Sequence, residues 1–282
     1  MRHETGTAEA VQRLPEPRLR DLVTVYHGYR YTGLAPGVHH GLPSTELTVV
    51  IALDDPLDVG WAADESTRGR YWAMTSGLHD RPALIRHHGS QHGIQLGLTP
   101  LGARALLGVP AAGLAAALVP LGAVVGPLVE KMYDEIAGVL TWQQRFDALD
   151  RHLVRWTQTP LGPRHWIRDE LRWAWSALQR SHGALRVEDL ARETGWSRRH
   201  FTAQFSGEFG IGPKTAARVM RFQRSRARLL AAPHGGGAQV AAECGYADQA
   251  HLSREWRELA GYSPTQWLRA EFPFLQDTVA AG

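Results

Sequence analysis

The sequence predicts an α+β protein in which a β-rich N-terminal domain with a helical extension is followed by an all-α C-terminal domain. Two observations predict this order. From Leu22 to about Leu98, short runs of β-branched and aromatic residues alternate with turn signals roughly every ten residues, which favours a small barrel or sandwich. After Pro100 the apolar residues recur at helical spacing almost to the end of the chain.

Length and composition are those of a globular protein with two domains. The chain has 282 residues, of which 44% are hydrophobic and 21% are charged. The single cysteine, Cys244, excludes an internal disulfide and a multi-cysteine zinc site, and it indicates a reducing cytoplasm. The opening residues lack an apolar core, so we expect no signal peptide.

The β-rich part consists of short predicted strands separated by polar turns. The strand-like runs are VTVYHGYRY, ELTVVIAL, RYWAMT, ALIRHH and GIQLGL, and the turn-like runs are GLAPG, DDP, ADESTRG and HHGSQHG. The following stretch from Ala105 to Val129 carries no charge, but three prolines and several glycines interrupt it. Short buried helices explain this stretch better than a membrane span does.

The helical extension ends in WQQRFDALDRHLVRW, where Trp142, Phe146, Leu149, Leu153 and Trp156 form one apolar stripe. We expect residues 1–18 to be a flexible lead-in, 19–157 an effector-binding or dimerisation domain, 158–165 a linker, 166–272 a helical domain and 273–282 a tail. The predicted helices of that domain are 166–181, 187–194, 197–208, 214–231, 239–244 and 248–259, with a short one from Pro264.

The helical domain contains an internal repeat. The segment SRRHFTAQFSGEFGIGP, which starts at Ser197, aligns without a gap with DQAHLSREWRELAGYSP, which starts at Asp248. In each copy a glycine, Gly195 or Gly245, can take the left-handed conformation that ends a helix. Ser197 and Asp248 then suit the N-cap of the next helix. This pattern predicts two helix–turn–helix motifs, the first motif over 187–208 and the second motif over 239–259.

The second helix of each motif has one apolar face and one outward face. Projection at 100° per residue places Phe201 and Phe205, and likewise Leu252 and Trp256, in the core. The outward faces carry side chains that can contact base edges and phosphates in a major groove. They are Arg198, Arg199, Thr202, Ala203 and Ser206 in the first motif, and Gln249, Ala250, Ser253, Arg254 and Arg257 in the second motif.

The segment between the motifs, PKTAARVMRFQRSRARLL, is basic and contains no acidic residue. From residue 164 onward the chain has 17 basic and 12 acidic residues, a net charge of +5, whereas the remainder carries −2. This asymmetry favours a polyanionic partner for the C-terminal part. We expect Arg221 and Arg224 of the connecting helix to contact phosphates. A helix of this length would hold the two motifs about one turn of B-DNA apart, roughly 34 Å.

Residues 166–272 resemble the DNA-binding domain of the AraC/XylS family of bacterial transcription regulators. The resemblance rests on VEDLARETGWSRRHFTAQFSGEFGIGPKTA, on the basic connection that ends in RARLL, and on VAAECGYADQAHLSREWRELAGYSPTQW. It implies a sequence-specific DNA-binding transcription factor with base contacts at Arg199, Thr202, Ala203, Ala250 and Arg254. It also implies promoter DNA as partner, RNA polymerase as a possible partner, and a cupin-like N-terminal domain that binds an unknown small effector or forms a homodimer.

Other functions fit the sequence less well. The histidine pairs at 39–40 and 87–88 have the wrong spacing for a cupin metal site, because neighbouring residues of a strand point to opposite faces. We therefore expect no metal, no cofactor and no catalytic residues. A cupin enzyme fused to a DNA-binding domain is the competing class. A DNA-repair alkyltransferase would need a zinc-activated cysteine cluster, which a lone Cys244 cannot supply. A purely structural helical protein is disfavoured by the basic connection.

Overall fold

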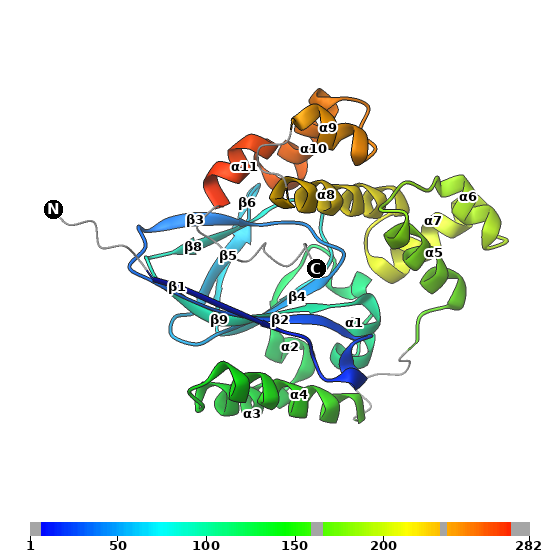
Figure 1. Cartoon of the computed structure of the whole chain (residues 1–282). Coiled ribbons are helices and arrows are strands. Elements are labelled where there is room, and N and C mark those ends of the chain that lie inside the picture. The colour runs from blue at the N-terminus through cyan, green and yellow to red at the C-terminus, as the bar shows by residue number, and fades with distance from the viewer. Residues whose placement is uncertain (1–6, 159–165, 232–235, 272–282) are drawn as a thin grey trace. The chain divides into compact units, whose positions relative to one another are not determined.

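The computed structural model describes residues 7–158, 166–231 and 236–271. The described chain divides into two compact units. We call them the N-terminal domain, which contains most residues up to 166, and the C-terminal domain, which begins at 167 (Figure 1). All described strands precede residue 121 and the described chain is purely helical after residue 166, so the predicted fold class is confirmed. Apart from Gln158, the last residue of a helix, the predicted linker and tail lie outside the described residues.

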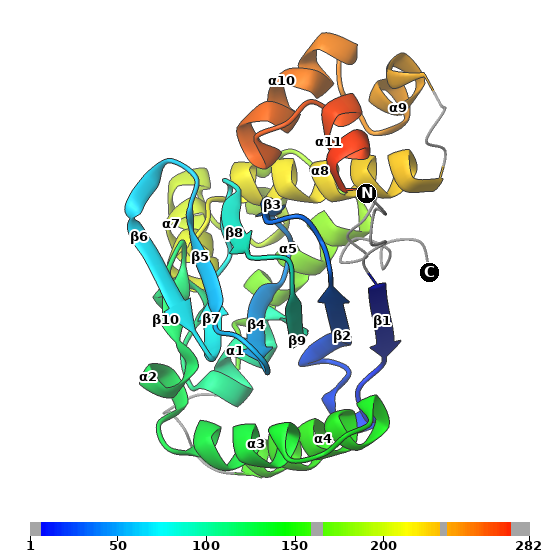
Figure 2. The same ribbon diagram turned by 90° about the vertical axis from the view of Figure 1, so that its left-hand side faces the viewer.

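The N-terminal domain contains two sheets. The first has the strand order β1–β2–β9–β4–β7–β10 with antiparallel neighbours. The second has the order β3–β8–β5–β6 (Figure 2). The strands are β1 (Thr7–Arg13), β2 (Val23–Thr32), β3 (Gly37–Gly41), β4 (Leu47–Ala52), β5 (Leu57–Trp61), β6 (Asp64–Tyr71), β7 (Ala73–Ser76), β8 (Ala83–His87), β9 (Gln91–Leu98) and β10 (Leu118–Pro120).

Two sequence predictions for this domain are wrong, and both concern polar strands at the edge of a sheet. Residues 7–13 of the expected flexible lead-in form β1, which pairs with β2, and Pro17–Leu19 form a 3-10 turn, η1. The segment ADESTRG, predicted as a turn, forms most of β6. Both strands expose most of their side chains. An edge strand with few buried residues lacks the apolar alternation on which the prediction relied.

The uncharged segment after β9 forms several short elements. They are α1 (Pro100–Leu107), the 3-10 turn η2 (Ala111–Leu114), β10, α2 (Leu121–Val125) and the start of α3 (Leu128–Ala137). Gly108, with φ +72°, ends α1 in the left-handed conformation. In the described part of the chain, no helix is both long and apolar enough to cross a membrane. The prediction of short buried helices holds, with β10 as an unpredicted addition.

Helix α4 (Trp142–Gln158) packs its apolar stripe onto the first sheet. Phe146, Leu149, Leu153 and Trp156 are buried, and the Phe146 ring stacks on Tyr26 of β2 at 5.7 Å. Trp142 lies over β2 at Gly28, where a Cβ atom would come within 2.5 Å of the indole ring. Because contacts inside the domain occupy the stripe, it is not a free surface through which this domain could dimerise.

We predict that Phe146→Ala lowers the free energy of unfolding of the N-terminal domain by about 3–5 kcal/mol, because it leaves a cavity beneath the sheet. Leu140→Ala is the control, since Leu140 is 90% exposed. Hydrogen exchange of the strand amides during a urea titration measures both. Equal effects of the two substitutions would contradict the packing role of α4.

Candidate nucleic-acid interface

The C-terminal domain consists of seven described helices. They are α5 (Asp169–Arg180), α6 (Val187–Glu193), α7 (Arg198–Phe209), α8 (Pro213–Ala231), α9 (Gly237–Glu243), α10 (Gln249–Ala260) and α11 (Pro264–Glu271). Helices α6 and α7 form the first motif and α9 and α10 form the second motif, while α8 connects them (Figures 1 and 2). The predicted boundaries agree with these to within three residues.

Each motif has a left-handed glycine and a side-chain N-cap in its turn, and the second turn is one residue longer than the first. Gly195 and Gly245 have φ values of +72° and +78°, a conformation that favours glycine. The Ser197 side chain accepts a hydrogen bond from His200 N at 3.3 Å, and Asp248 accepts one from His251 N at 2.6 Å. The predicted helix ends and N-caps are therefore confirmed in both motifs.

The cores that support the two helices differ in chemistry. The first motif uses an aromatic cluster, in which the Trp175 ring of α5 stacks on Phe209 at 4.4 Å and Phe205 lies 4.5 Å from Phe209. In the second motif the Trp256 indole Nε1 donates a hydrogen bond to Ser225 Oγ of α8 at 2.8 Å. Cys244 belongs to that buried cluster, and burial raises the pKa of its thiol. A buried thiol of this kind is a poor nucleophile.

The outward faces of α7 and α10 are open to solvent as the periodicity predicts. Arg198, Arg199 and Ala203 are exposed on α7, and Gln249, Ala250, Arg254 and Arg257 are exposed on α10. Thr202, Ser206 and Ser253 are half-exposed beside them. Arg198 forms a 2.9 Å ion pair with Glu188 of α6, but both side chains are mostly exposed. Such a pair contributes little and leaves Arg198 able to exchange partners.

Arg221 does not have the environment that we predicted for a phosphate contact. Its guanidinium lies within 2.9–3.2 Å of both carboxylate oxygens of Glu255 and over the ring of Tyr246 at 5.0 Å. Arg218 also binds Glu255, at 3.0 Å, and Glu255 is only 5% exposed. Burial lowers the pKa of Arg221 and the hydrogen bonds to Glu255 raise it, with a net increase, so the guanidinium stays charged.

Much of the positive charge of α8 is therefore compensated inside the domain. The acidic partners come from the second motif, because Glu258 binds Arg218 and Glu243 binds Arg228. These pairs could not be predicted from the sequence of α8, because that helix has no acidic residue of its own. Lys214 is exposed and Arg224 is half-exposed, and within the described residues neither forms an ion pair. Of the two predicted phosphate contacts on α8, Arg224 remains and Arg221 becomes a structural residue.

Helix α8 sets the separation of the two motifs. Its 19 residues correspond to about 28 Å at 1.5 Å per residue. This length approaches one turn of B-DNA, about 34 Å. Among the described residues, no group of three or more His, Cys, Asp or Glu side chains could hold a metal ion.

Comparisons with known proteins identify the C-terminal domain. Residues 190–270 match the family described as "Helix-turn-helix domain". The HTH-type transcriptional regulator Rv1931c of Mycobacterium tuberculosis is 34% identical over 91 residues, which are 32% of this chain and 35% of that protein. The chain therefore matches about a third of the length of this curated relative.

Two solved structures of ToxT from Vibrio cholerae have the same fold over both domains. An apo point variant is 11% identical, with coverage of 94% of this chain and 97% of that chain and a TM-score of 0.53. A complex with (E)-4-(8-methylnaphthalen-1-yl)but-3-enoic acid is 10% identical, with coverage of 94% and 99% and a TM-score of 0.50.

We predict that Arg221→Ala lowers the free energy of unfolding of the C-terminal domain by about 2 kcal/mol or more. Breaking a buried ion pair outright costs about 3–5 kcal/mol, and here Arg218 still contacts the carboxylate of Glu255. The control is Arg224→Ala on the same helix, which we expect to change stability by less than about 0.5 kcal/mol. Urea unfolding of the full chain compares them. A similar effect of both substitutions would refute the structural assignment of Arg221.

We predict that Gly207→Ala raises the stability of the first motif by up to about 1 kcal/mol, because glycine is a poor helix former. A Cβ atom at Gly207, inside α7, would meet nothing within 4 Å. Gly210→Ala should instead lower stability, since Gly210 has φ +77°. Thermal unfolding of the two variants measures these opposite changes in stability. A loss of stability in Gly207→Ala would contradict the prediction.

Proposed function

Residues 190–270 form a helix-turn-helix domain of the AraC type, and on this premise we propose that the chain is a sequence-specific regulator of transcription that binds promoter DNA through both motifs. The observation that carries the proposal is the pair of second helices, α7 and α10. Both follow a turn with a left-handed glycine and begin at a side-chain N-cap. Both expose arginine and small polar side chains on the face away from their cores.

Base contacts and phosphate contacts can be divided by chemistry. Arg199, Thr202 and Ala203 of α7 and Ala250 and Arg254 of α10 lie where direct base contacts are expected. An alanine can only contact a thymine methyl group, so the arginines carry most of the discrimination. Phosphate contacts are then assigned to flanking residues, namely Arg198, Ser206, Gln249, Ser253, Arg257 and Arg224.

The N-terminal domain is proposed to control this binding through a small effector. This proposal is supported by the fold that the chain shares with ToxT, because one solved structure of ToxT contains a bound small carboxylic acid. RNA polymerase and a second copy of the chain are further proposed partners, and a cytoplasmic location follows from the same function. The curated relative is named as a transcriptional regulator, and we propose no catalytic role for this chain.

Selection of binding sites from random duplex DNA by the full chain tests the proposal. We expect one chain per site and two sequence elements about one helical turn apart, because both motifs belong to one chain. Sedimentation of the selected complex gives the stoichiometry. A chain that is folded but enriches no sequence would contradict the proposed function, whereas a strict requirement for two chains per site would contradict only the pairing of motifs within one chain.

We predict that Arg254→Ala relaxes the preference at one base pair of the selected site, a G·C pair. An arginine can donate two hydrogen bonds to guanine, worth about 1–3 kcal/mol of discrimination. Arg224→Ala is the matched control, since a lost phosphate contact weakens all sequences alike and reduces the salt slope by about one. Repeated selection with each variant measures the difference. An unchanged motif in Arg254→Ala would show that this side chain does not contact a base.

A further inference from the structure

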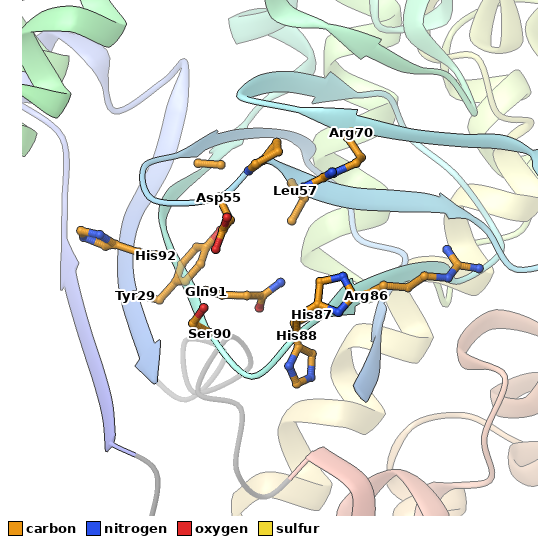
Figure 3. A pocket seen from close by; sticks show the side chains of 12 residues that line it. Tyr29, Asp55, Leu57, Arg70, Arg86, His87, His88, Ser90, Gln91 and His92 are labelled. Atoms are coloured by element: carbon orange, nitrogen blue, oxygen red, sulfur yellow. The ribbon is translucent and has the colours of Figure 1, made fainter. Parts of the chain in front are cut away.

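The N-terminal domain contains a partly open pocket between the β4–β5 turn and the start of β9. Figure 3 shows the side chains of Tyr29, Asp55, Gln91 and His87 gathered around one hollow, while His92 points away from them. The wall is partly apolar, because Ala52, Pro56 and Leu57 also line it. Arg70, Arg86, His88 and Ser90 also line it.

The size of the pocket limits its occupant to a small molecule. Its cavity volume is about 150 Å³, comparable with an apolar cavity known to hold benzene. An occupant of roughly six to ten non-hydrogen atoms fits this space. The apolar cavity beneath the first sheet is much smaller, about 10 Å³, and leaves no room for a long hydrocarbon chain.

Two opposite charges on the pocket rim are not used in ion pairs in the described part of the chain, although the charge of Arg70 contributes to the lowered pKa of Asp58. Within the described residues, Arg70 and Asp55 form neither an ion pair nor a hydrogen bond. Their neighbours do form such pairs, because Arg68 binds Asp58 at 2.7 Å and Asp54 binds His92 at 2.9 Å. The pocket therefore offers an exposed guanidinium and an exposed carboxylate to a ligand, whereas the guanidinium of Arg86, which also lines the pocket, binds Glu65 at 2.7 Å.

The pocket wall adds neutral hydrogen-bonding groups. The Gln91 Oε1 atom is buried without a hydrogen-bond partner among the described residues. A buried acceptor of this kind favours a ligand that brings a donor. Burial, with a smaller contribution from His88, lowers the pKa of His87. At neutral pH the His87 ring is therefore uncharged and adds no net charge to the pocket wall.

We propose that this pocket binds a small zwitterion of the amino-acid type as the effector. The carboxylate of the ligand would pair with Arg70, its ammonium group with Asp55 and Gln91 Oε1, and its side chain would contact Leu57 and Tyr29. The regulatory meaning of this site rests on the proposed function, but binding itself does not. Since both charges lie at an exposed rim, each pair contributes modestly, and we expect a Kd of about 10 µM to 1 mM.

Ligand-observed NMR with the full chain tests the charge requirement. The probes are the common amino acids in pools, followed by three matched compounds: leucine, its amide, which lacks the carboxylate, and 2-hydroxy-4-methylpentanoate, which lacks the ammonium group. The best amino acid from the pools is compared with its own amide and hydroxy acid in the same way. We expect the amino acid to bind at least about tenfold more tightly than either analogue.

Substitutions assign the binding to this pocket. Arg70→Gln should abolish the preference for the amino acid over its amide, and Asp55→Asn should abolish its preference over the hydroxy acid. Arg30→Gln is the control, because Arg30 is an exposed arginine of β2 that does not line the pocket, and it should change the Kd less than about twofold.

Three outcomes overturn the inference: no amino acid binds at about 1 mM, an analogue binds as tightly as its amino acid, or Arg70→Gln and Asp55→Asn leave binding unchanged. A gel shift with selected DNA, run on the same samples, separates the two proposals. Intact DNA binding with any of these outcomes refutes the effector class alone, and loss of sequence-specific DNA binding in the unmodified chain refutes the proposed function.

Discussion

The buried carboxylate of Glu255 constrains the geometry of the C-terminal domain more than any other single group. It lies on α10, is 5% exposed, and binds Arg218 and Arg221 of α8. A charge that has lost its hydration is stable only while both cations stay in place. Helices α8 and α10 are therefore fixed to each other. This contact sets the direction of the exposed face of α10.

The repeat shows how one local design can be supported by two different cores. The glycine turn and the N-cap depend on residues within each motif, and they recur with φ values of +72° and +78°. Behind these turns, the first motif packs Trp175, Phe205 and Phe209, whereas the second combines apolar packing with the Glu255 ion pairs and the Trp256–Ser225 hydrogen bond. Both motifs thus have an aromatic core, and the second adds the buried ion pairs and the hydrogen bond.

In the N-terminal domain, the packing of the core determines which surfaces are left for binding. The apolar stripe of α4 packs on the first sheet and is part of the core. What stays open is a polar hollow beside β9, where a cation and an anion lie on one rim. Apolar groups thus build the core of this domain, and the charged groups of the pocket lie at its surface.

The sequence by itself determined the order of the domains, both helix–turn–helix motifs and the exposed residues of α7 and α10. These features depend on local rules: helical periodicity, a left-handed glycine and an N-cap act within a few residues. Only the tertiary structure decided the role of Arg221, the strands β1 and β6, and the meeting of Arg70 with Asp55 at one pocket. Arg221 depends on Glu255, and β1 depends on pairing with β2, whereas β6 is the polar outer strand of a hairpin with β5. Residue type and spacing alone do not specify which group will compensate a charge or pair with a polar edge strand.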